Sequence, residues 1–413
     1  MTKPKILWNA KDHPALNSGY GIIGRHLLPL LAEQYGKDNI IIFAPVYEKD
    51  KVGEWGGMKV LPGIGFDYGE GIILEHYQRE ECNILLQVGD AWPLGVVQNL
   101  AAKNQIDWVQ WLPVDWLGMP KNITNRIWSA HKLVSFSKYG ESALRKANFT
   151  NVEPAIWIGL DTELWKPQPR EELSSMMHVL GYERDTFNLL IVAANQERKA
   201  IYEQLEAIKL LRQLEPSIPM RLYIHTQMRR ERDLSADIDQ MGIGDIIVYP
   251  DEYVMNLGGI TEEEMVMMFN CADVLLNACF EGFGICMTQA QACGVPVIYL
   301  LEGTGPELVI NGVGIPPISN ITYPNQLTRP LPNPMAITQA LMEIWKRQVE
   351  IGKPLRSERA PEFIQENFGW KKIAEQWFGV IERVMWDKER HCYSIPEPSE
   401  ELKERAKDLI TLR

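Results

Sequence analysis

Residues 280–298 decide the fold and have the sequence FEGFGICMTQAQACGVPVI. This stretch predicts the end of a strand, a turn at Gly282 and Gly284, a helix, and a second strand from Val295. Because glycine can adopt backbone angles closed to other residues, the amides that enter the helix from Gly284 can point together at an anion. The helix dipole adds about half a positive charge there, and Glu281 stands where it could accept hydrogen bonds from a hydroxylated group. The stretch therefore favours a sugar nucleotide held by its diphosphate.

The composition is that of a soluble globular enzyme of roughly two or three domains. The chain has 413 residues, of which 46% are hydrophobic and 23% charged, with a formal net charge of -12. This charge disfavours loose binding to nucleic acid or to an anionic membrane. We find neither the apolar region of a signal peptide nor an apolar run of about 18 residues. The six cysteines are not spaced as zinc ligands. We therefore expect a cytoplasmic protein with reduced thiols.

Short apolar strands alternate with helical segments in two series, which predicts two lobes with parallel sheets covered by helices on both faces. Strands are expected in the first lobe at 6–8, 40–43, 84–88, 108–112, 133–135 and 155–158, and in the second at 189–193, 221–225, 246–249, 274–277 and 295–300. Helices are expected at 24–35, 138–148, 234–241, 261–269, 370–384 and 399–412. Turn formers and prolines indicate a hinge after residue 159. We therefore predict a first lobe at 1–165, a hinge at 166–186, a second lobe at 187–368 and C-terminal helices at 369–413, the first of which packs back on the first lobe.

Two adjacent cations, Arg198 and Lys199, follow the first strand of the second lobe. They are expected at the carboxyl edge of the sheet, where doubly wound folds bind ligands. Arginine supplies a forked donor and lysine a point charge, and both suit a phosphate leaving group that gains negative charge. The alternative is that the pair only begins a solvated helix face. Together with the glycine turn two strands later, the pair favours a diphosphate clamp.

At this point a family resemblance emerges from the order of several motifs. These are Arg198-Lys199, Thr261 to Glu264, Glu281-Gly282-Phe283-Gly284, residues 292–297 and Gly305-Pro306-Glu307. Their order resembles the donor lobe of retaining GT-B glycosyltransferases of the family-4 type, glycosyl transferases group 1. The resemblance is strong over residues 189–307 and extends to the first lobe in layout only. It implies an α/β GT-B fold, in which two Rossmann-like, doubly wound lobes face each other across a cleft.

The resemblance also implies an activity and a set of site residues. The second lobe would hold a UDP- or GDP-linked sugar, and the first would present the hydroxyl of a saccharide, small molecule or lipid. Two family glutamates bracket the donor. Glu281 matches the first, whereas Gln289 replaces the second with an amide, which leaves the donor's identity less certain. The expected catalytic residues are Glu281, Arg198, Lys199 and Asp115, and the expected donor-binding residues are Gly19, Gly21, Asn195, Gly282, Phe283, Gly284, Ile285, Gln289, Thr304 and Glu307.

Some of these assignments have alternatives. Asp115 occupies the place where many family members carry a histidine, and it can equally be a turn-capping residue. Gly19 and Gly21 lie in a Gly-x-Gly-x-x-Gly pattern that is too far from the first strand for a dinucleotide fingerprint. We assign them to a loop near the donor phosphate and the acceptor.

We expect no metal, because fixed cations and a helix dipole would replace it. The sequence Asp237-Ile238-Asp239 imitates a metal motif, but it lies in a predicted helix and is interpreted as a solvated face. Three other functions remain open. In the first, the enzyme would glycosylate a hydroxylated nucleobase in DNA, and the aromatic-rich first lobe would hold a flipped base. In the second, it would epimerise a sugar nucleotide at carbon 2. In the third, the protein would bind a sugar nucleotide without converting it.

Overall fold

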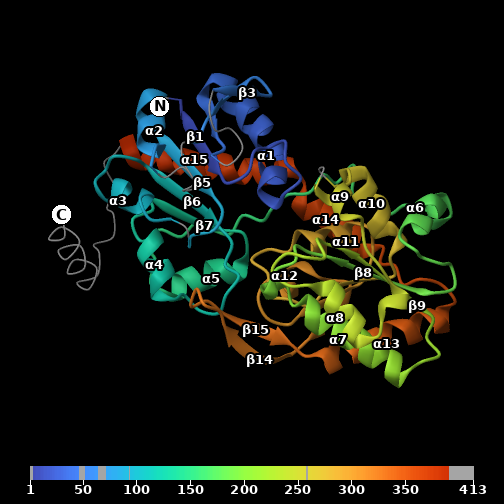
Figure 1. Ribbon diagram of the computed structural model, residues 1–413. Coiled ribbons are helices and arrows are strands. Elements are labelled where there is room, and N and C mark those ends of the chain that lie inside the picture. The colour runs from blue at the N-terminus through green and yellow to red at the C-terminus, as the bar shows by residue number, and fades with distance from the viewer. Residues whose placement is uncertain (1–2, 46–51, 64–70, 93, 257–258, 390–413) are drawn as a thin grey trace. The chain divides into compact units, whose positions relative to one another are not determined.

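A computed structural model describes residues 3–45, 52–63, 71–92, 94–256 and 259–389 (Figure 1). The chain divides into two compact units. The first comprises residues 1–114, 118–158 and 370–413, and the second comprises 115–117 and 159–369. Each unit contains a largely parallel sheet flanked by helices, which confirms the predicted α/β class. No helix within the described ranges has both the length and the apolar content needed to cross a bilayer.

The first unit is built on a seven-stranded sheet in the order β3-β4-β2-β1-β5-β6-β7. All neighbouring strands are parallel except β3 and β4. The central strands are fully buried because helices cover both faces of a parallel sheet. The strands are β1 Ile6–Ala10, β2 Ile40–Phe43, β3 Gly53–Trp55, β4 Met58–Leu61, β5 Ile84–Val88, β6 Trp108–Leu112 and β7 Lys132–Ser135.

One expected strand does not form. Residues 152–156 run alongside β7 with irregular pairing, which includes an isolated bridge between Leu133 and Val152, and residues 155–158 form no strand. Ile156 still donates its amide to the Ser135 carbonyl at 3.0 Å. However, Pro154 has no amide hydrogen to donate to a ladder. The segment is therefore extended chain rather than an eighth strand.

The helices of the first unit include a long first helix, α1, which begins earlier than expected. The helices are α1 Gly19–Tyr35, α2 Ile73–Arg79, α3 Val97–Ala102, α4 Lys121–Ile127, α5 Lys138–Lys146 and α15 Trp370–Glu389, with a 3₁₀ turn η1 at Lys37–Asn39. Gly19 and Gly21 lie in the first turn of α1, and Ser18 caps it by accepting from the Gly21 amide at 3.1 Å. A Cβ at Gly21 would lie 2.3 Å from the Leu16 carbonyl oxygen. The assignment of these glycines to a loop was therefore wrong, and Gly21 instead permits close packing of the helix on the preceding turn.

The last described helix, α15, belongs to the first unit and packs against α1 (Figure 1, red and dark blue). The ring of Trp377 lies 4.9 Å from that of Trp111 on β6. Near the end of the helix, Asp387 pairs with Lys132 at 3.0 Å and with His131 at 3.2 Å. The predicted helix at 399–412 lies outside the described residues.

The second unit is built on a six-stranded parallel sheet in the order β10-β9-β8-β11-β12-β13. The strands are β8 Phe187–Val192, β9 Met220–His225, β10 Ile247–Val248, β11 Val274–Asn277, β12 Val297–Leu300 and β13 Gly312–Ile315. A separate antiparallel hairpin, which we did not expect from the sequence, follows β13 and comprises β14 Pro317–Thr322 and β15 Thr328–Pro332. Gln326, with a positive φ of 63°, lies in its turn.

The helices of the second unit surround its sheet. They are α6 Ser174–Val179, α7 Ile201–Leu214, α8 Leu234–Met241, α9 Glu252–Asn256, α10 Glu262–Cys271, α11 Ile285–Ala292, α12 Gly305–Leu308, α13 Pro334–Ile351 and α14 Arg359–Phe368, with 3₁₀ turns η2 Arg170–Leu173, η3 Glu197–Lys199 and η4 Gly244–Ile246. The predicted capping box at α10 is confirmed. The Thr261 hydroxyl accepts from the Glu264 amide at 3.2 Å, and the Glu264 carboxylate accepts from the Thr261 amide at 2.7 Å.

Candidate functional site

Arg198 and Lys199 lie in the short turn η3 between β8 and α7. The turn ends at Ala200, which adopts the left-handed conformation with φ 49° and ψ 36°. This conformation is costly for a residue with a Cβ, so surrounding contacts must hold it. Gln204 does so, because its amide nitrogen donates to the carbonyls of Lys199 at 3.1 Å and Ala200 at 3.2 Å. Its amide oxygen accepts from the backbone of Ala278, after β11, at 3.3 Å.

Five charged side chains of the second unit form a continuous ion-paired group, here called the charged cluster: Asp115, Arg198, Lys199, Glu281 and Arg329. Lys199 Nζ lies 2.5 Å from Glu281 Oε1, and Arg198 Nη1 lies 3.8 Å from Glu281 Oε2. Arg198 Nη1 also lies 3.3 Å from Asp115 Oδ2. Arg329 Nη2 donates to both carboxylate oxygens of Asp115 at 3.0 Å. Cations and carboxylates thus alternate along the cluster.

The electrostatics of the cluster favour an additional anion. It contains three cations and two carboxylates, which together carry a formal net charge of +1. Arg198 is the most exposed member, with 30% of its side chain accessible, against 13% for Lys199 and 11% for Glu281. Burial alone would raise the pKa of Glu281, but the neighbouring Lys199 and Arg198 hold that pKa below its usual value. The carboxylate is therefore ionised, and the Cys279 thiol also donates to it at 3.4 Å.

The glycine turn after β11 leads into α11 as expected. Gly284 is the N-cap of α11 and has a φ of 98°, a conformation that L side chains rarely adopt. Gly282 is not among the glycines of positive φ, so only one of the two requires glycine for its backbone angle. The carbonyl of Gly284 accepts from the Met287 amide at 2.9 Å. The amides of Ile285 and Cys286 precede this bond and, as first-turn amides, have no intrahelical acceptor.

Three predicted donor-binding residues have structural tasks in this unit. Asn195 is buried, and its amide nitrogen donates to the carbonyls of Gln227 at 2.9 Å and Arg232 at 2.7 Å, so it ties two loops together. Thr304 is fully buried, and its hydroxyl is bonded to the carbonyls of Glu281 and Phe283 at 3.2 and 2.7 Å. The ring of Phe283 is also buried and packs against Phe368. These residues therefore stabilise the loops of the second unit through contacts within it.

The remaining predicted residues occupy three places. Gln289 lies in the second turn of α11 and is buried. Glu307 lies in the short helix α12, where its amide donates to the Thr304 carbonyl at 3.1 Å. Gly19 and Gly21 belong to the first unit and lie in α1.

Sequence reasoning missed Arg329 and Gln204. Arg329 lies on a hairpin that we did not expect, and Gln204 is an ordinary helix residue by sequence. No local pattern distinguishes either one from other polar residues. Their roles become visible only through their partners.

The Asp-x-Asp sequence does not form a metal site. Asp237 is buried and accepts from Arg232 through both carboxylate oxygens, at 2.5 Å from Nε and 2.9 Å from Nη2. The interpretation as a solvated face is therefore wrong for Asp237, whose carboxylate anchors the loop before α8, whereas Asp239 is exposed as expected. Among the described residues, no three His, Cys, Asp or Glu side chains are grouped as metal ligands.

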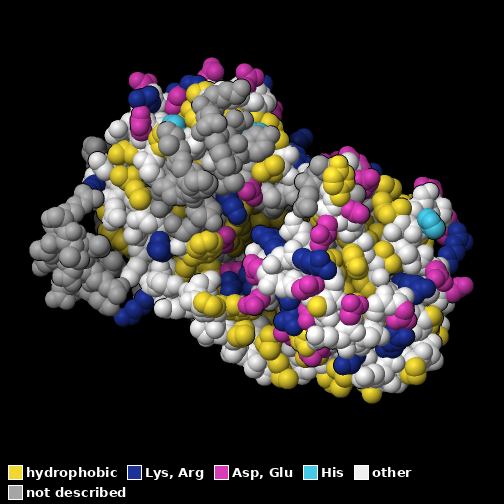
Figure 2. Space-filling view, in the orientation of Figure 1, with side chains coloured by type: hydrophobic (Ala, Val, Ile, Leu, Met, Phe, Trp, Pro, Cys, Tyr) yellow, Lys and Arg dark blue, Asp and Glu magenta, His cyan; other side chains and the backbone are white. Residues whose placement is uncertain are grey.

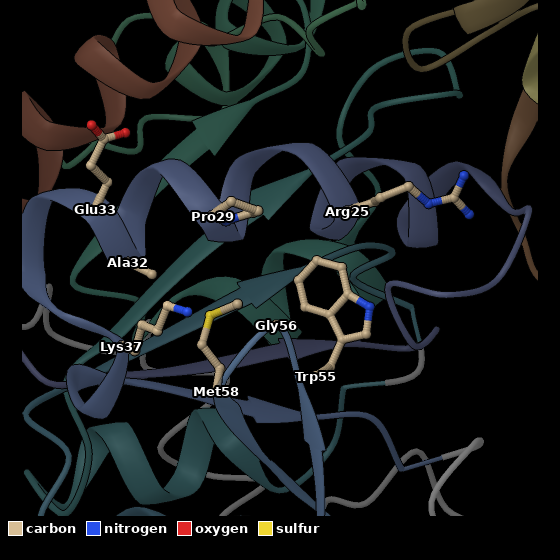
Figure 3. A pocket seen from close by; sticks show the side chains of 8 residues that line it. All are labelled: Arg25, Pro29, Ala32, Glu33, Lys37, Trp55, Gly56 and Met58. Carbon is tan, nitrogen blue, oxygen red and sulfur yellow. The ribbon is translucent and has the colours of Figure 1, made fainter.

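A separate cavity lies in the first unit, between α1 and the β3–β4 hairpin (Figure 3). Its volume is about 400 Å³, and no member of the charged cluster lines it. Trp55 and Met58 point toward α1 from below, and Arg25 and Glu33 lie on the helix (Figure 3). On the visible face of the molecule, acidic and basic side chains are intermixed rather than gathered in one basic area (Figure 2).

Comparison with known proteins finds similarity to one family within the second unit. Residues 186–346 match the model of the family described as glycosyl transferases group 1. A D-inositol 3-phosphate glycosyltransferase of Pseudarthrobacter chlorophenolicus is 30% identical over 138 residues, which are 32% of this chain and 30% of that protein. The matches span 30% to 47% of the length of the curated relatives.

Solved structures resemble the chain over nearly its whole length. A glycosyltransferase from Rickettsia africae has a TM-score of 0.67 at 15% identity, covering 93% of this chain and 99% of that one. Anabaena HepE in complex with UDP and glucose also has a TM-score of 0.67 at 15% identity, covering 92% and 99%. The chain therefore has the GT-B fold, and its residues 186–346 are similar to the glycosyl transferases group 1 family.

Proposed function

We propose that this protein is a glycosyltransferase that moves a sugar from a nucleotide-diphosphate sugar to an acceptor hydroxyl. The observation that carries the proposal is the contact of Arg198 and Lys199 with Glu281, at the glycine turn that opens α11. Cations, a carboxylate and helix amides at one sheet edge suit a pyrophosphate with a hydroxylated sugar attached.

The cluster suggests how a donor would bind. In the structure, Arg198 and Lys199 are both paired with Glu281. Diphosphate oxygens would take over these cations, and Glu281 would then be available to accept hydrogen bonds from sugar hydroxyls. The same cations would stabilise the charge that develops on the leaving phosphate.

In the proposed reaction, the bond between the anomeric carbon and the phosphate oxygen breaks, and the acceptor oxygen bonds to that carbon from the same face. The acceptor proton passes to the leaving phosphate oxygen, so no separate base is needed. We infer retention of configuration, which the family resemblance implies. The complex of HepE with UDP and glucose supports a UDP-linked donor, and the inositol phosphate glycosyltransferase supports a small hydroxylated acceptor.

The first test uses Arg198→Ala and Lys199→Ala, assayed with a panel of UDP- and GDP-linked sugars for release of nucleoside diphosphate. Each substitution should lower turnover by about 10²-fold or more, because each removes a charge that stabilises the leaving group. Arg212→Ala is the matched control, since Arg212 forms an exposed pair with Asp245 in the same unit. Turnover by either variant at the wild-type rate, with the fold intact by circular dichroism, would contradict the proposal.

The same assay separates transfer from its rivals. A 2-epimerase would consume the sugar nucleotide without net release of diphosphate, and a binding protein would leave it intact. Anomeric analysis of the product by NMR tests retention. Addition of EDTA should leave the rate unchanged, because the cations of the cluster would take the place of a metal ion.

A further inference from the structure

The β14–β15 hairpin carries a buried arginine to the charged cluster. Arg329 lies on β15 opposite Ile321 and is only 5% exposed. Its Nε donates to the backbone carbonyl of Asp115 at 2.6 Å, in addition to the two bonds from Nη2 to the Asp115 carboxylate. Next to it, the Leu117 amide donates to the Thr328 carbonyl at 2.8 Å. The hairpin therefore holds both the backbone and the side chain of the segment 115–117.

Asp115 links this hairpin to the proposed donor site. Its Oδ2 accepts from Arg329 and also lies 3.3 Å from Arg198 Nη1. Arg198 is in turn 3.8 Å from Glu281. Because Arg329 contacts both carboxylate oxygens of Asp115, the rotation of this carboxylate is restricted. The carboxylate therefore attracts the Arg198 guanidinium from a fixed direction.

We propose that Arg329 is a positioning residue, which fixes Asp115 so that Asp115 holds the Arg198 guanidinium directed at the diphosphate. This inference rests on the proposed function and adds to it two residues outside the phosphate contact itself. Asp115 is then also a positioning residue rather than a group that meets the acceptor. The benefit is preorganisation, because Arg198 is the most exposed member of the charged cluster, with 30% of its side chain accessible, and Asp115 restricts its guanidinium.

The geometry requires arginine at position 329. Three hydrogen bonds leave one guanidinium in fixed directions, whereas the ammonium group of lysine is a point charge without a planar fork. The ring of Tyr323 lies 5.1 Å from the guanidinium carbon and supports its plane. Lysine would keep the charge near Asp115 but not the orientation of its carboxylate.

The test compares Arg329→Lys, Arg329→Gln, Asp115→Asn and the double variant Asp115→Asn/Arg329→Gln with the wild type. For the sugar nucleotide that the wild type accepts, we would measure kcat, the donor KM and the thermal midpoint, and binding of inorganic pyrophosphate by calorimetry. The single variants should lower kcat about tenfold or more while the donor KM changes by less than about threefold, since the lost orientation matters most in the transition state. The double variant should be no slower than the slower single one, because both residues act through one path.

Two variants keep the test decisive if a lone buried charge prevents folding. Arg329→Lys preserves the charge, and the double variant removes both partners of the buried pair. Arg212→Gln is the control for loss of a forked arginine–aspartate pair, and it should leave kcat unchanged.

Two results would overturn the inference while leaving the proposed function standing. One is a kcat within about twofold of wild type for all Arg329 variants, which would make Arg329 a purely structural residue. The other is multiplication of the two single losses in the double variant, which would show independent roles. If the folded wild type binds neither pyrophosphate nor any UDP- or GDP-linked sugar, the proposed function itself fails, and the inference fails with it.

Discussion

At the scale of the residue, the partner of a polar group decides its role. Arg198 pairs with Asp115 and Lys199 with Glu281. By contrast, the side chains of Asn195 and Thr304 donate hydrogen bonds to backbone carbonyls. All four residues have side chains that could bind a sugar nucleotide. A sequence shows which groups are available, but only the fold shows which of them are already bonded.

His225 illustrates the same point and leads to a prediction about pH. It ends β9, its Nδ1 is buried without a partner, and burial lowers its pKa to about 4. In the unfolded chain a histidine has a pKa of about 6.5, so between pH 4 and pH 6.5 the unfolded state binds more protons than the folded state. The stability of the protein should therefore be complete above about pH 6.5 and fall as the pH decreases toward 4, by an amount on the order of 2 kcal/mol from this residue.

The measurement is the urea midpoint between pH 7 and pH 4.5 for the wild type and His225→Gln. The variant should show a flatter pH dependence, because it cannot take up the proton on unfolding. His178→Gln is the control, since His178 is exposed on α6 of the same unit. An equal slope for wild type and His225→Gln would show that the buried imidazole does not account for the loss.

At the scale of the element, the start of α11 depends on one glycine. Gly284 has a φ of 98°, and a Cβ there would lie 2.2 Å from the terminal methyl of Met287, which can move. Strain from the backbone angle is therefore the main cost of a side chain. The same turn sets the direction of the first amides of the helix, on which the proposed phosphate contact depends.

We predict that Gly284→Ala destabilises the protein by about 1 to 2 kcal/mol and also weakens donor binding. Gly242→Ala is a matched control, because Gly242 also has a positive φ, of 67°, with no heavy atom within 4 Å of the added Cβ, at the end of α8. Both variants should lose stability in urea titrations, and only Gly284→Ala should lose affinity for the nucleoside diphosphate in calorimetry. Equal affinity for all three proteins would remove the glycine turn from the donor site.

At the scale of the whole molecule, the charge balance bears on the acceptor. The formal net charge is -12, and the visible surface mixes both signs (Figure 2). Binding to DNA draws its sequence-independent affinity from the release of counterions by clustered cations. From this net charge we propose an acceptor smaller and less charged than a DNA duplex.

We predict that the protein is not retained by duplex DNA containing hydroxymethylated bases, even at about 50 mM salt, and transfers no sugar to it. Filter binding at several salt concentrations and a radioactive donor assay would measure both. Retention that weakens steeply with salt, together with labelled DNA, would instead make the nucleobase the acceptor.

Much of the architecture was determined by the sequence alone. Apolar periodicity and the positions of glycine and proline indicated most of the strands of both sheets, the capping box at Thr261 and the turn into α11. These features depend on local backbone preference and on burial, and both are determined by residues close together in the sequence. The expected strand at 155–158 failed for a local reason as well, since Pro154 cannot donate to a ladder.

Only the tertiary structure decided which charges meet. Asp115 and Arg329 are separated by 214 residues, and Lys199 and Glu281 by 82. The pairing of such residues depends on strand order and on a hairpin that no short sequence motif predicts. Ion pairs form through space, where cations and carboxylates approach only after the chain has folded, so their partners are set by the packing of the unit and not by spacing along the chain.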